Sequence, residues 1–217
     1  MKLIKQYWRW EWKPEPELAL ARIERAARTC YKSEEKMENI TPEQSEDFLS
    51  GIMGRGHHSV IEHSDASVRI ITNRGVTHEL VRHRLAAYSQ ESTRYCNYSK
   101  SKFGNELTFI KPVWWSDDPA DERCRQIFLR ACGNDENDYL KLIQWGWSPQ
   151  QAREILGNAL KTEIIMSANF REWNHVFNLR CSKGAHPQMR ALMLSILPEF
   201  ARLYSPIFDD VAKKYSV

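Results

Sequence analysis

The stretch SDASVRIITN, Ser64–Asn73, decides the fold class of this 217-residue chain. Its apolar and β-branched residues predict a strand, which the turn-forming sequence Asn73-Arg74-Gly75 closes. A second strand is predicted in ELTFIKP, residues 106–112. Because these strands lie among helical segments, the pattern indicates an α+β fold rather than a doubly wound parallel sheet. We predict a mixed, mostly antiparallel sheet flanked by helices.

Helical patterns lie on both sides of the strands. The segment EPELALARIERAARTCYKS, residues 15–33, places apolar and small residues mostly on one helical face. A second helix begins after the cap Thr41 and ends near Gly54. The C-terminal half is predicted to be helical. Its helices are expected over 121–143 with an interruption near Gly133, from a capping box at Ser148 and Gln151, over 169–181 and over 186–204.

Composition is that of an ordinary globular protein, with 42% hydrophobic and 27% charged residues. The absence of repeats, low-complexity tracts and linkers predicts a single domain over residues 1–217. No apolar run approaches the roughly 18 residues of a membrane-spanning helix, and the charged, aromatic N-terminus lacks a signal-peptide core. We therefore expect a cytoplasmic protein without a membrane partner.

Cysteine usage and net charge exclude further classes of protein. The five cysteines are scattered and never form C-x-x-C, which excludes a disulfide framework and zinc-ribbon spacing. Most are expected to be buried or half-buried thiols. A net charge of +3 is too weak to indicate nucleic-acid binding, but it suits small anionic ligands.

The segment HELVRHRLAAYSQESTRY, residues 78–95, carries more basic side chains than core packing requires. Read as a helix, it would be amphipathic, with an apolar stripe made by Val81, Leu85 and Tyr88 and with basic groups beside it. Three hypotheses follow from this pattern: a metal site, a nucleic-acid grip or an anion pocket.

A metal site is disfavoured by helical phase. HELVRH resembles the H-E-x-x-H zinc signature but has one residue too many, so His78 and His83 would lie roughly 140° apart around a helix. In HHSVIEH, His58 and Glu62 share a helical face, whereas His63 is out of phase. We predict no metal.

The two other hypotheses are that this segment binds nucleic acid or a small anion. Arginines interleaved with tyrosines could grip a single strand by charge and stacking, but no basic face extends beyond this segment. An anion pocket fits better, because arginine forks bind phosphates bidentately and Ser89, Gln90 and Ser92 could read the edge of a planar heterocycle. Downstream arginines at 153, 171 and 180 would complete the pocket if the fold brings them together.

These residues resemble a known family. RHRLAAYSQES matches the pattern R-H-R, seven residues, then serine, which is similar to the signature of the flavin-dependent thymidylate synthases. The segments GHHSVIEH, AREIL and NFREWNHVFNLR occur around it in the family's order. Together these blocks cover most of the span from about residue 29 to residue 190.

The resemblance implies an activity. Such enzymes convert dUMP to dTMP, with methylenetetrahydrofolate as the one-carbon donor and FAD, re-reduced by NADPH, as the hydride carrier. They are homotetramers whose active sites lie at subunit interfaces, with dUMP, folate and NADPH as ligands. No protein cysteine attacks the pyrimidine, in agreement with the absence of a cysteine in an activating context here.

The resemblance also implies a role for individual residues. Arg180 would polarise the uracil and, with Ser92 and Arg82, make up the catalytic group. The residues implied in substrate binding are Glu79, Arg82, Gln90, Ser92, Arg94, Arg153 and Arg180. Those implied in binding the cofactor are His57, Ser59, Glu62, His83, Arg84, Asn169, Arg171 and His175.

Three departures from the family pattern bear on these roles. Glu79 stands where many members have glutamine, Gly157 stands where proline is usual, and AHPQMR, residues 185–190, replaces a commoner sequence. Two other functions remain as alternatives. One is a flavoprotein that modifies another pyrimidine nucleotide, and the other is a non-catalytic module that binds single-stranded nucleic acid.

Overall fold

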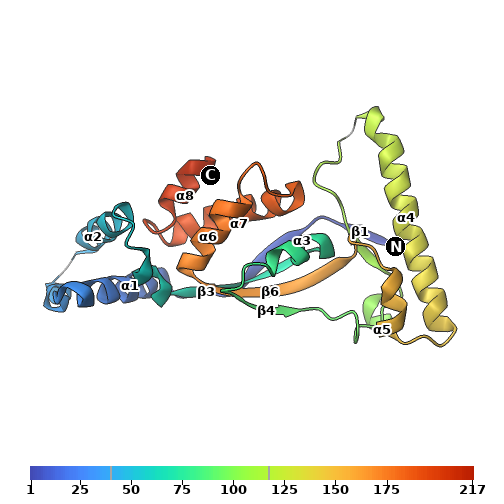
Figure 1. Cartoon of the computed structure of the whole chain (residues 1–217), viewed down its shortest axis with the longest axis horizontal. Helices are drawn as coiled ribbons and strands as arrows, with labels where there is room; N and C mark the ends of the chain where they lie inside the picture. The colour runs from blue at the N-terminus through green and yellow to red at the C-terminus, as the bar shows by residue number, and fades with distance from the viewer. Residues whose placement is uncertain (40, 117) are drawn as a thin grey trace. The chain divides into compact units, whose positions relative to one another are not determined.

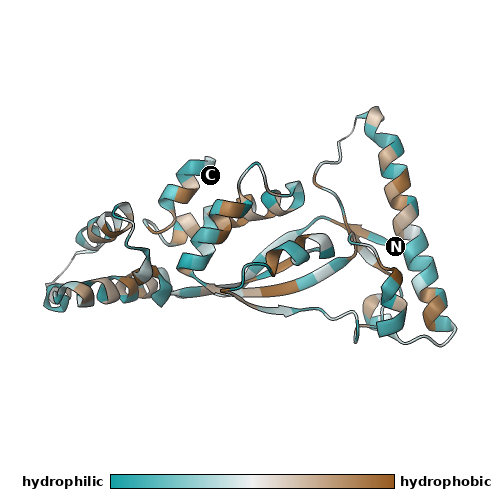
Figure 2. Ribbon diagram, viewed as in Figure 1, coloured by the Kyte–Doolittle hydropathy of each residue, from teal (hydrophilic) through white to brown (hydrophobic). Residues whose placement is uncertain are grey.

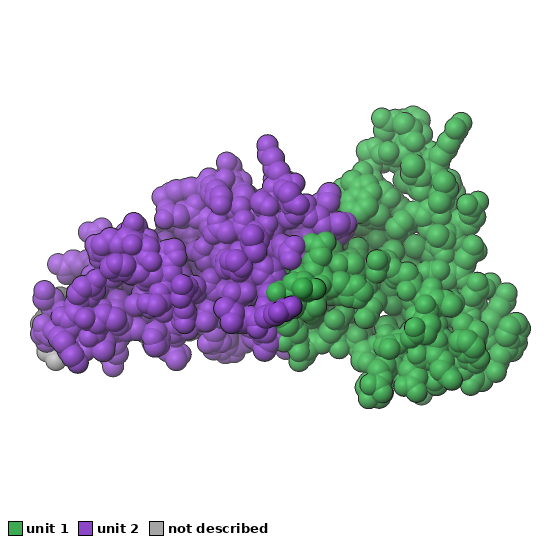
Figure 3. Space-filling model, in the orientation of Figure 1, with its two compact units in different colours: residues 1–9, 69–82, 88–165 green, residues 10–68, 83–87, 166–217 purple. Residues whose placement is uncertain are grey.

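The structure is a computed structural model, which describes residues 1–39, 41–116 and 118–217. Its internal contacts group into two compact units (Figure 3). Unit 1 comprises Met1–Arg9, Arg69–Arg82 and Tyr88–Ile165, and unit 2 comprises Trp10–Val68, His83–Ala87 and Met166–Val217.

The sheets confirm the predicted α+β class. Four antiparallel strands have the order β2-β3-β6-β4, and two further strands, β1 and β5, pair in parallel with Leu3 opposite Phe109. The bounds are β1 Lys2–Ile4, β2 Tyr7–Trp12, β3 Asp65–Asn73, β4 Ala87–Gln90, β5 Thr108–Ile110 and β6 Lys161–Asn169. The mixed, mostly antiparallel arrangement is as predicted.

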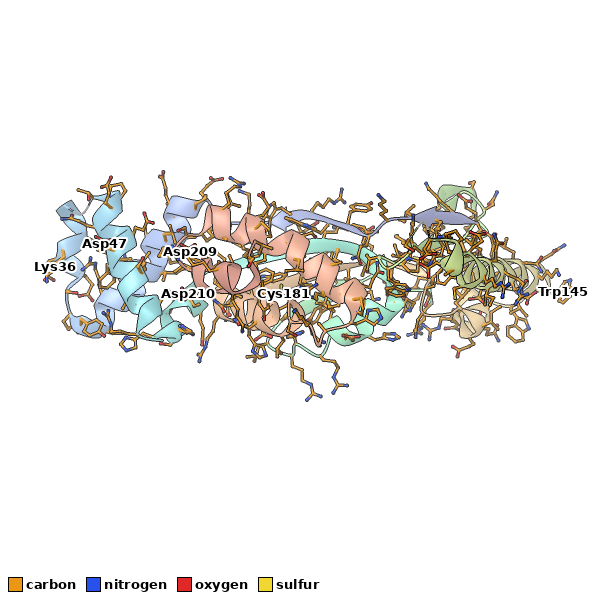
Figure 4. All side chains as sticks on the ribbon, turned by 90° about the horizontal axis from the view of Figure 1, so that it is seen from above. Lys36, Asp47, Trp145, Cys181, Asp209 and Asp210 are labelled. Carbon is orange, nitrogen blue, oxygen red and sulfur yellow. The ribbon has the colours of Figure 1, made fainter. Side chains whose placement is uncertain are left out.

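Four helices of unit 2, α1, α2, α6 and α7, follow the predicted positions closely, whereas α8 was not predicted (Figure 1). Helix α2 begins at Pro42 after the predicted cap Thr41, whose hydroxyl accepts from the backbone N–H of Gln44 at 3.3 Å. The acidic pair Asp209 and Asp210 occupies the first turn of α8 (Figure 4), where the helix dipole favours negative charge. The bounds are α1 Pro16–Tyr31, α2 Pro42–Gly54, α6 Phe170–Arg180, α7 Pro187–Leu203 and α8 Asp209–Tyr215, with 3-10 helices η1 Glu34–Asn39 and η2 His58–His63.

Aromatic packing builds the core of unit 2. Helices α6, α7 and α8 contact one another, and a cluster of buried rings lies among them. The Phe170 and Tyr204 ring centroids are 4.6 Å apart, and Trp173 stacks on Phe177 at 5.6 Å. The indole N–H of Trp173 donates to the carbonyl of Ala66 at 3.0 Å, which ties α6 to β3. This core holds α6, and with it several predicted site residues, in a defined place.

Unit 1 contains the remaining helices. Helix α4 buries Cys132 and Tyr139, and Figure 2 shows polar and apolar residues alternating along it. It runs through Gly133 without a break, so the predicted interruption is wrong. A lone glycine lowers helix propensity by about 1 kcal/mol, which a packed helical face offsets. The bounds are α3 Arg74–Leu80, α4 Pro119–Gln144 and α5 Pro149–Ala152, with 3-10 helices η3 Ser101–Phe103 and η4 Arg153–Ile155.

The helical interpretation of residues 78–95 is also wrong. Helix α3 ends at Leu80 and β4 begins at Ala87, so the R-H-R triplet lies in a turn. Leu85 is 79% exposed and is not part of an apolar stripe. The strand β3 ends at Asn73 as predicted, but Asn73 then caps α3 by accepting from the backbone N–H of Val76 at 2.8 Å. The phase argument against a metal therefore does not apply to His83.

Strand β6 was not anticipated, because the C-terminal half was expected to be helical. Its sequence KTEIIMSAN nevertheless alternates, with every second residue buried: Thr162, Ile164, Met166 and Ala168. This period of two is typical of a strand with one face on a core. In the described part of the chain, no helix is long and apolar enough to cross a membrane.

Candidate active site

The predicted site residues divide between the two units (Figure 3). Apart from Arg180, all predicted substrate-binding residues belong to unit 1: Glu79, Arg82, Gln90, Ser92, Arg94 and Arg153. All predicted cofactor-binding residues, and Arg180, belong to unit 2.

A basic pocket of about 290 Å³ lies in unit 1. Its lining consists of Arg74, His78, Thr93, Arg153, Glu154, Leu156 and Leu160. Two guanidinium groups outnumber the one carboxylate, and Nε of Arg153 lies 3.5 Å from Oε1 of Glu154. Arg153 donates from Nη1 to the Thr93 hydroxyl at 3.3 Å, which directs its guanidinium. Nη1 of Arg74 is buried and has no hydrogen-bond partner among the described residues. Because two guanidinium groups belong to its lining, this pocket is suited to an anion.

Arg74 is a residue that sequence reasoning missed. It was read as part of a turn, whereas it is the first residue of α3, and its backbone N–H donates to the carbonyl of Leu160 at 3.1 Å. That bond brings it beside Arg153, although the two arginines are far apart in the chain. Arg94, predicted for the same role, does not line the pocket; it is exposed, and its guanidinium lies 5.4 Å from the Tyr95 ring centroid.

Strand β4 and the turn after it present the predicted Ser-Gln-x-Ser residues. The side-chain nitrogen of Gln90 donates to the hydroxyls of Thr77 and Thr162, each at 3.0 Å. The Ser92 hydroxyl accepts from the backbone N–H of Arg94 at 3.3 Å, and its carbonyl accepts from Cys96 at 2.9 Å. Both side chains are thus held in place by hydrogen bonds, and one of those from Gln90 spans 72 residues of sequence.

Glu91, between these two residues, organises a half-buried polar network. One carboxylate oxygen accepts from the Tyr98 hydroxyl at 2.8 Å and the other from Lys161 at 2.7 Å. Burial, with Glu91 beside it, raises the pKa of the Tyr98 hydroxyl, which stays protonated. Arg69 pairs with Glu163 nearby, and a pocket of about 400 Å³ includes all of these charged groups in its lining. This network fixes the strand that carries Gln90.

Glu79 and Arg82, both predicted to bind substrate, do not line any of the three pockets described here. Glu79 is half-buried, and its backbone carbonyl accepts from the N–H of Arg82 at 3.2 Å. Arg82 is exposed, as is Arg84 on the other side of the triplet.

In unit 2, helix α6 and the R-H-R turn bring four titratable groups together. Arg180 donates from Nε to Nε2 of His83 at 2.9 Å. Nδ1 of His83 lies 3.6 Å from Oε1 of Glu172, beyond hydrogen-bond distance, and the His175 ring meets the His83 ring edge-on at 5.8 Å. His83 and Glu172 are buried, whereas His175 is exposed.

Burial, the Arg180 guanidinium and His175 lower the pKa of His83 to about 4. Its imidazole is therefore neutral at pH 7, and its approach to Glu172 is not an ion pair. Burial also raises the pKa of Glu172, and His175 opposes that shift.

His83, Glu172 and His175 offer ligand atoms that all lie within 4.8 Å of one another. Two histidines and a carboxylate are a common set for zinc. Nε2 of His83, however, already accepts from Arg180, so the proton of a neutral ring is on Nδ1. A metal on Nδ1 would move that proton to Nε2, where it would face the Arg180 donor. The pairing of His83 with Arg180 and the binding of a metal are therefore mutually exclusive.

A second pocket of unit 2, about 520 Å³, gathers half of the predicted cofactor residues. Its lining consists of Glu62, Leu85, Asn169, Arg171, Glu172 and His175. Arg171 pairs with Glu62, and the Asn169 side chain caps α6 by accepting from the N–H of Glu172 at 2.9 Å. A guanidinium paired with a carboxylate, a second carboxylate, an amide and an imidazole lie around the exposed Leu85, so the pocket offers hydrogen-bonding groups and one apolar side chain to a polar heterocycle.

The other predicted cofactor residues, His57, Ser59, His83 and Arg84, do not line this pocket. The ring Nδ1 of His57 lies 3.3 Å from the Tyr31 hydroxyl. His57, Ser59 and Arg84 are exposed.

The two buried cysteines are not activated nucleophiles, because burial disfavours the thiolate. Cys181 directly follows α6 (Figure 4) and is completely buried, and burial raises its pKa to about 12. Burial likewise raises the pKa of Cys132 to about 11. Cys96 is half-buried, so three of the five cysteines are buried or half-buried, as expected for most of them, whereas Cys30 and Cys124 are exposed.

Comparison with known proteins identifies relatives of this chain. A profile of the family "Thymidylate synthase complementing protein" matches residues 15–204. The chain is 36% identical over 189 residues to a flavin-dependent thymidylate synthase of Geobacter sulfurreducens, covering 85% of this chain and 78% of that protein. It is 33% identical over 171 residues to one of Pyrococcus furiosus, covering 78% and 68%.

A solved structure shares the fold. The UMP/dUMP methylase PolB from Streptomyces cacaoi, bound with 5-Br dUMP, superposes with a TM-score of 0.77 at 18% identity, covering 99% of this chain and 98% of that one. The profile match and the identities to curated enzymes establish that the chain belongs to the flavin-dependent thymidylate synthase family.

Proposed function

We propose that the protein converts dUMP to dTMP, with methylenetetrahydrofolate as the one-carbon donor, FAD as the hydride carrier and NADPH as its reductant. The observation that carries this proposal is the basic pocket of Arg74, Thr93 and Arg153, which is suited to the phosphate of a nucleotide. Family membership supports the flavin. In this proposal the chain forms one functional domain over residues 1–217. The protein is cytoplasmic and assembles into a homotetramer with active sites at the subunit interfaces.

In this proposal Arg74 and Arg153 bind the phosphate by charge-assisted hydrogen bonds. Arg94, which is exposed, joins them from its own turn. Ser92 and Gln90 contact the nucleoside. Because the side-chain nitrogen of Gln90 already donates to two threonines, its carbonyl oxygen is the group that meets the nucleotide. Glu79 completes this set.

Arg180 faces the uracil and stabilises negative charge that develops on the ring, in a site where burial strengthens such interactions. Arg82 lies between nucleotide and cofactor. The cofactor contacts are those of the unit 2 pocket, namely Glu62, Asn169, Arg171 and His175, together with Arg84, His57 and Ser59 from its surroundings. When bound, FAD supplies the hydride chemistry, and the protein binds and polarises the reactants.

The test is spectroscopic and chemical. The purified protein should carry the visible absorbance band of a flavin, and it should release tritium from dUMP labelled at C5 when methylenetetrahydrofolate and NADPH are present. A protein that stays colourless and cannot take up added FAD would contradict the proposal. Steep salt dependence of oligonucleotide binding, without flavin, would instead support the nucleic-acid module. Light scattering measures the tetramer.

A second pyrimidine substrate is favoured by one comparison, because the superposing PolB acts on UMP as well as dUMP. Competition between dUMP and UMP for turnover separates the two possibilities. Comparable specificity constants for both nucleotides would identify the broader enzyme.

A further inference from the structure

The middle residue of the R-H-R triplet points in the opposite direction from its neighbours. Arg82 and Arg84 are exposed, whereas His83 is only 5% exposed. A histidine that served only as a ligand contact would not need to be buried against α6. Its burial indicates a role through a contact inside the protein.

His83 touches Arg180. The Nε of Arg180 donates to Nε2 of His83 at 2.9 Å across 97 residues of sequence. An arginine side chain in a protein keeps its proton, so Nε is always a donor and Nε2 must present a lone pair. A neutral ring in that state carries its proton on Nδ1, the atom that lies 3.6 Å from Glu172.

The surroundings hold the ring in this one state. Among the contacts of the described residues, the titratable or charged groups that face it include Arg180, Glu172 and His175, all three from α6. A protonated imidazole would place an N–H donor against the Arg180 donor and add a cation beside a cation. The Glu172 carboxylate lies on the opposite side of the ring and favours the proton on Nδ1. Both effects keep Nε2 as an acceptor.

We propose that His83 is a positioning residue: as the neutral Nδ1–H tautomer, it accepts from Nε of Arg180 and fixes the direction of that guanidinium. The Nη groups of Arg180 then lie in the plane set by this bond, because guanidinium is planar. The inference rests on the proposed function, in which Arg180 faces the uracil. It assigns His83 to the orientation of a substrate-binding arginine rather than to direct contact with the flavin.

Two variants separate these roles. His83→Leu keeps the volume of a buried side chain and removes the acceptor, whereas His83→Gln places an amide oxygen near the position of Nε2. In the flavin-loaded enzyme, His83→Leu should weaken dUMP binding by about 10- to 100-fold, the effect of one hydrogen bond to a charged group. His83→Gln should recover most of that loss. Calorimetry measures the dissociation constant, and visible absorbance measures flavin retention in the same samples.

A role in flavin contact predicts a different pattern. Both variants would then lose flavin to a similar extent, and glutamine would not rescue dUMP binding; that outcome would overturn the proposal. Equal dUMP affinity in all three proteins would overturn it as well. The KM for dUMP is expected to rise in His83→Leu more than the KM for NADPH.

One further measurement does not depend on dUMP. Nitrogen-15 spectra of histidine-labelled protein report which ring nitrogen carries the proton, and the signal absent from His83→Gln identifies His83. We expect a protonated Nδ1 and an unprotonated Nε2 at pH 7. A protonated Nε2 would overturn the inference even if dUMP binds. If dUMP does not bind the wild-type protein, the proposed function fails, and this spectrum alone decides the pairing.

Discussion

The buried, neutral His83 should make the stability of this protein depend on pH in a way that one substitution removes. Its pKa is about 4 in the folded protein against 6.5 for an ordinary histidine. The unfolded chain therefore binds more protons than the folded one between these values. The free energy of unfolding should fall as the pH drops from about 6.5 toward about 4.

The size of the effect follows from the two pKa values. One pKa unit corresponds to about 1.4 kcal/mol, so the full shift is worth roughly 3 kcal/mol below pH 4. Between pH 7 and pH 4.5 the contribution lost is about 2.4 kcal/mol. Because the side chain is only 5% exposed, solvent screening reduces this value little. This is a large part of the roughly 5–15 kcal/mol that stabilises a typical domain.

The assay compares wild type with His83→Gln by urea unfolding at several pH values, at fixed protein concentration and flavin content. Glutamine fills a similar space but does not titrate. Other groups, including Glu172 with its raised pKa, titrate in both proteins and largely cancel in the difference. The wild-type curve should fall more steeply than the variant curve on the acid side.

Parallel curves for the two proteins between pH 7 and pH 4.5 would refute the reasoning. They would mean that His83 titrates as freely in the folded protein as in the unfolded chain. The burial and the Arg180 contact would then not hold the ring neutral. A steeper fall in the variant than in the wild type would refute the sign of the effect.

Three further predictions test other parts of the structure. Arg74→Gln should weaken dUMP binding about 10- to 100-fold by removing a charged donor to the phosphate, whereas Arg130→Gln, on the exposed side of α4, should leave the affinity unchanged in calorimetry. Ser92→Ala should lower turnover in the tritium-release assay but not abolish it, since no serine adduct is needed; complete loss with normal FAD and dUMP binding would contradict this role. Thr41→Ala should lower the free energy of unfolding by about 1 kcal/mol in urea titrations by removing the α2 cap, and no change would show that the cap is not coupled to global unfolding.

Much of the helical structure could be predicted because its causes are local. Helix α1 follows from a periodic pattern, and α2 from the hydroxyl cap Thr41 and the glycine at its end. Strand β3 follows from its β-branched composition. Each of these signals lies within one segment of the chain, and no distant residue has to be known to interpret it.

The errors arose where a distant partner decides the structure. Residues 81–86 were read as part of a helix because spaced apolar residues suggested one, yet the segment turns and continues into β4, which β6 pairs with. Strand β6 carries a local signal, its period of two, but the expectation of a helical C-terminal half outweighed that signal, and its place between β3 and β4 depends on distant parts of the chain. Helix α4 continues through Gly133 because the packed face outweighs one glycine.

The family signature and the residue types of the site could be read from the sequence, because R-H-R followed at a fixed distance by serine is a linear pattern. The sequence could not show which of these residues meet in space. Arg74 and Arg153 meet in one pocket because α3 and the turn before β6 are bonded to each other. His83 finds Arg180 across 97 residues, so its tautomer, its depressed pKa and its inward direction exist only in the folded chain. A sequence determines which groups are available, but burial and hydrogen-bond partners arise only when segments far apart in the chain pack together.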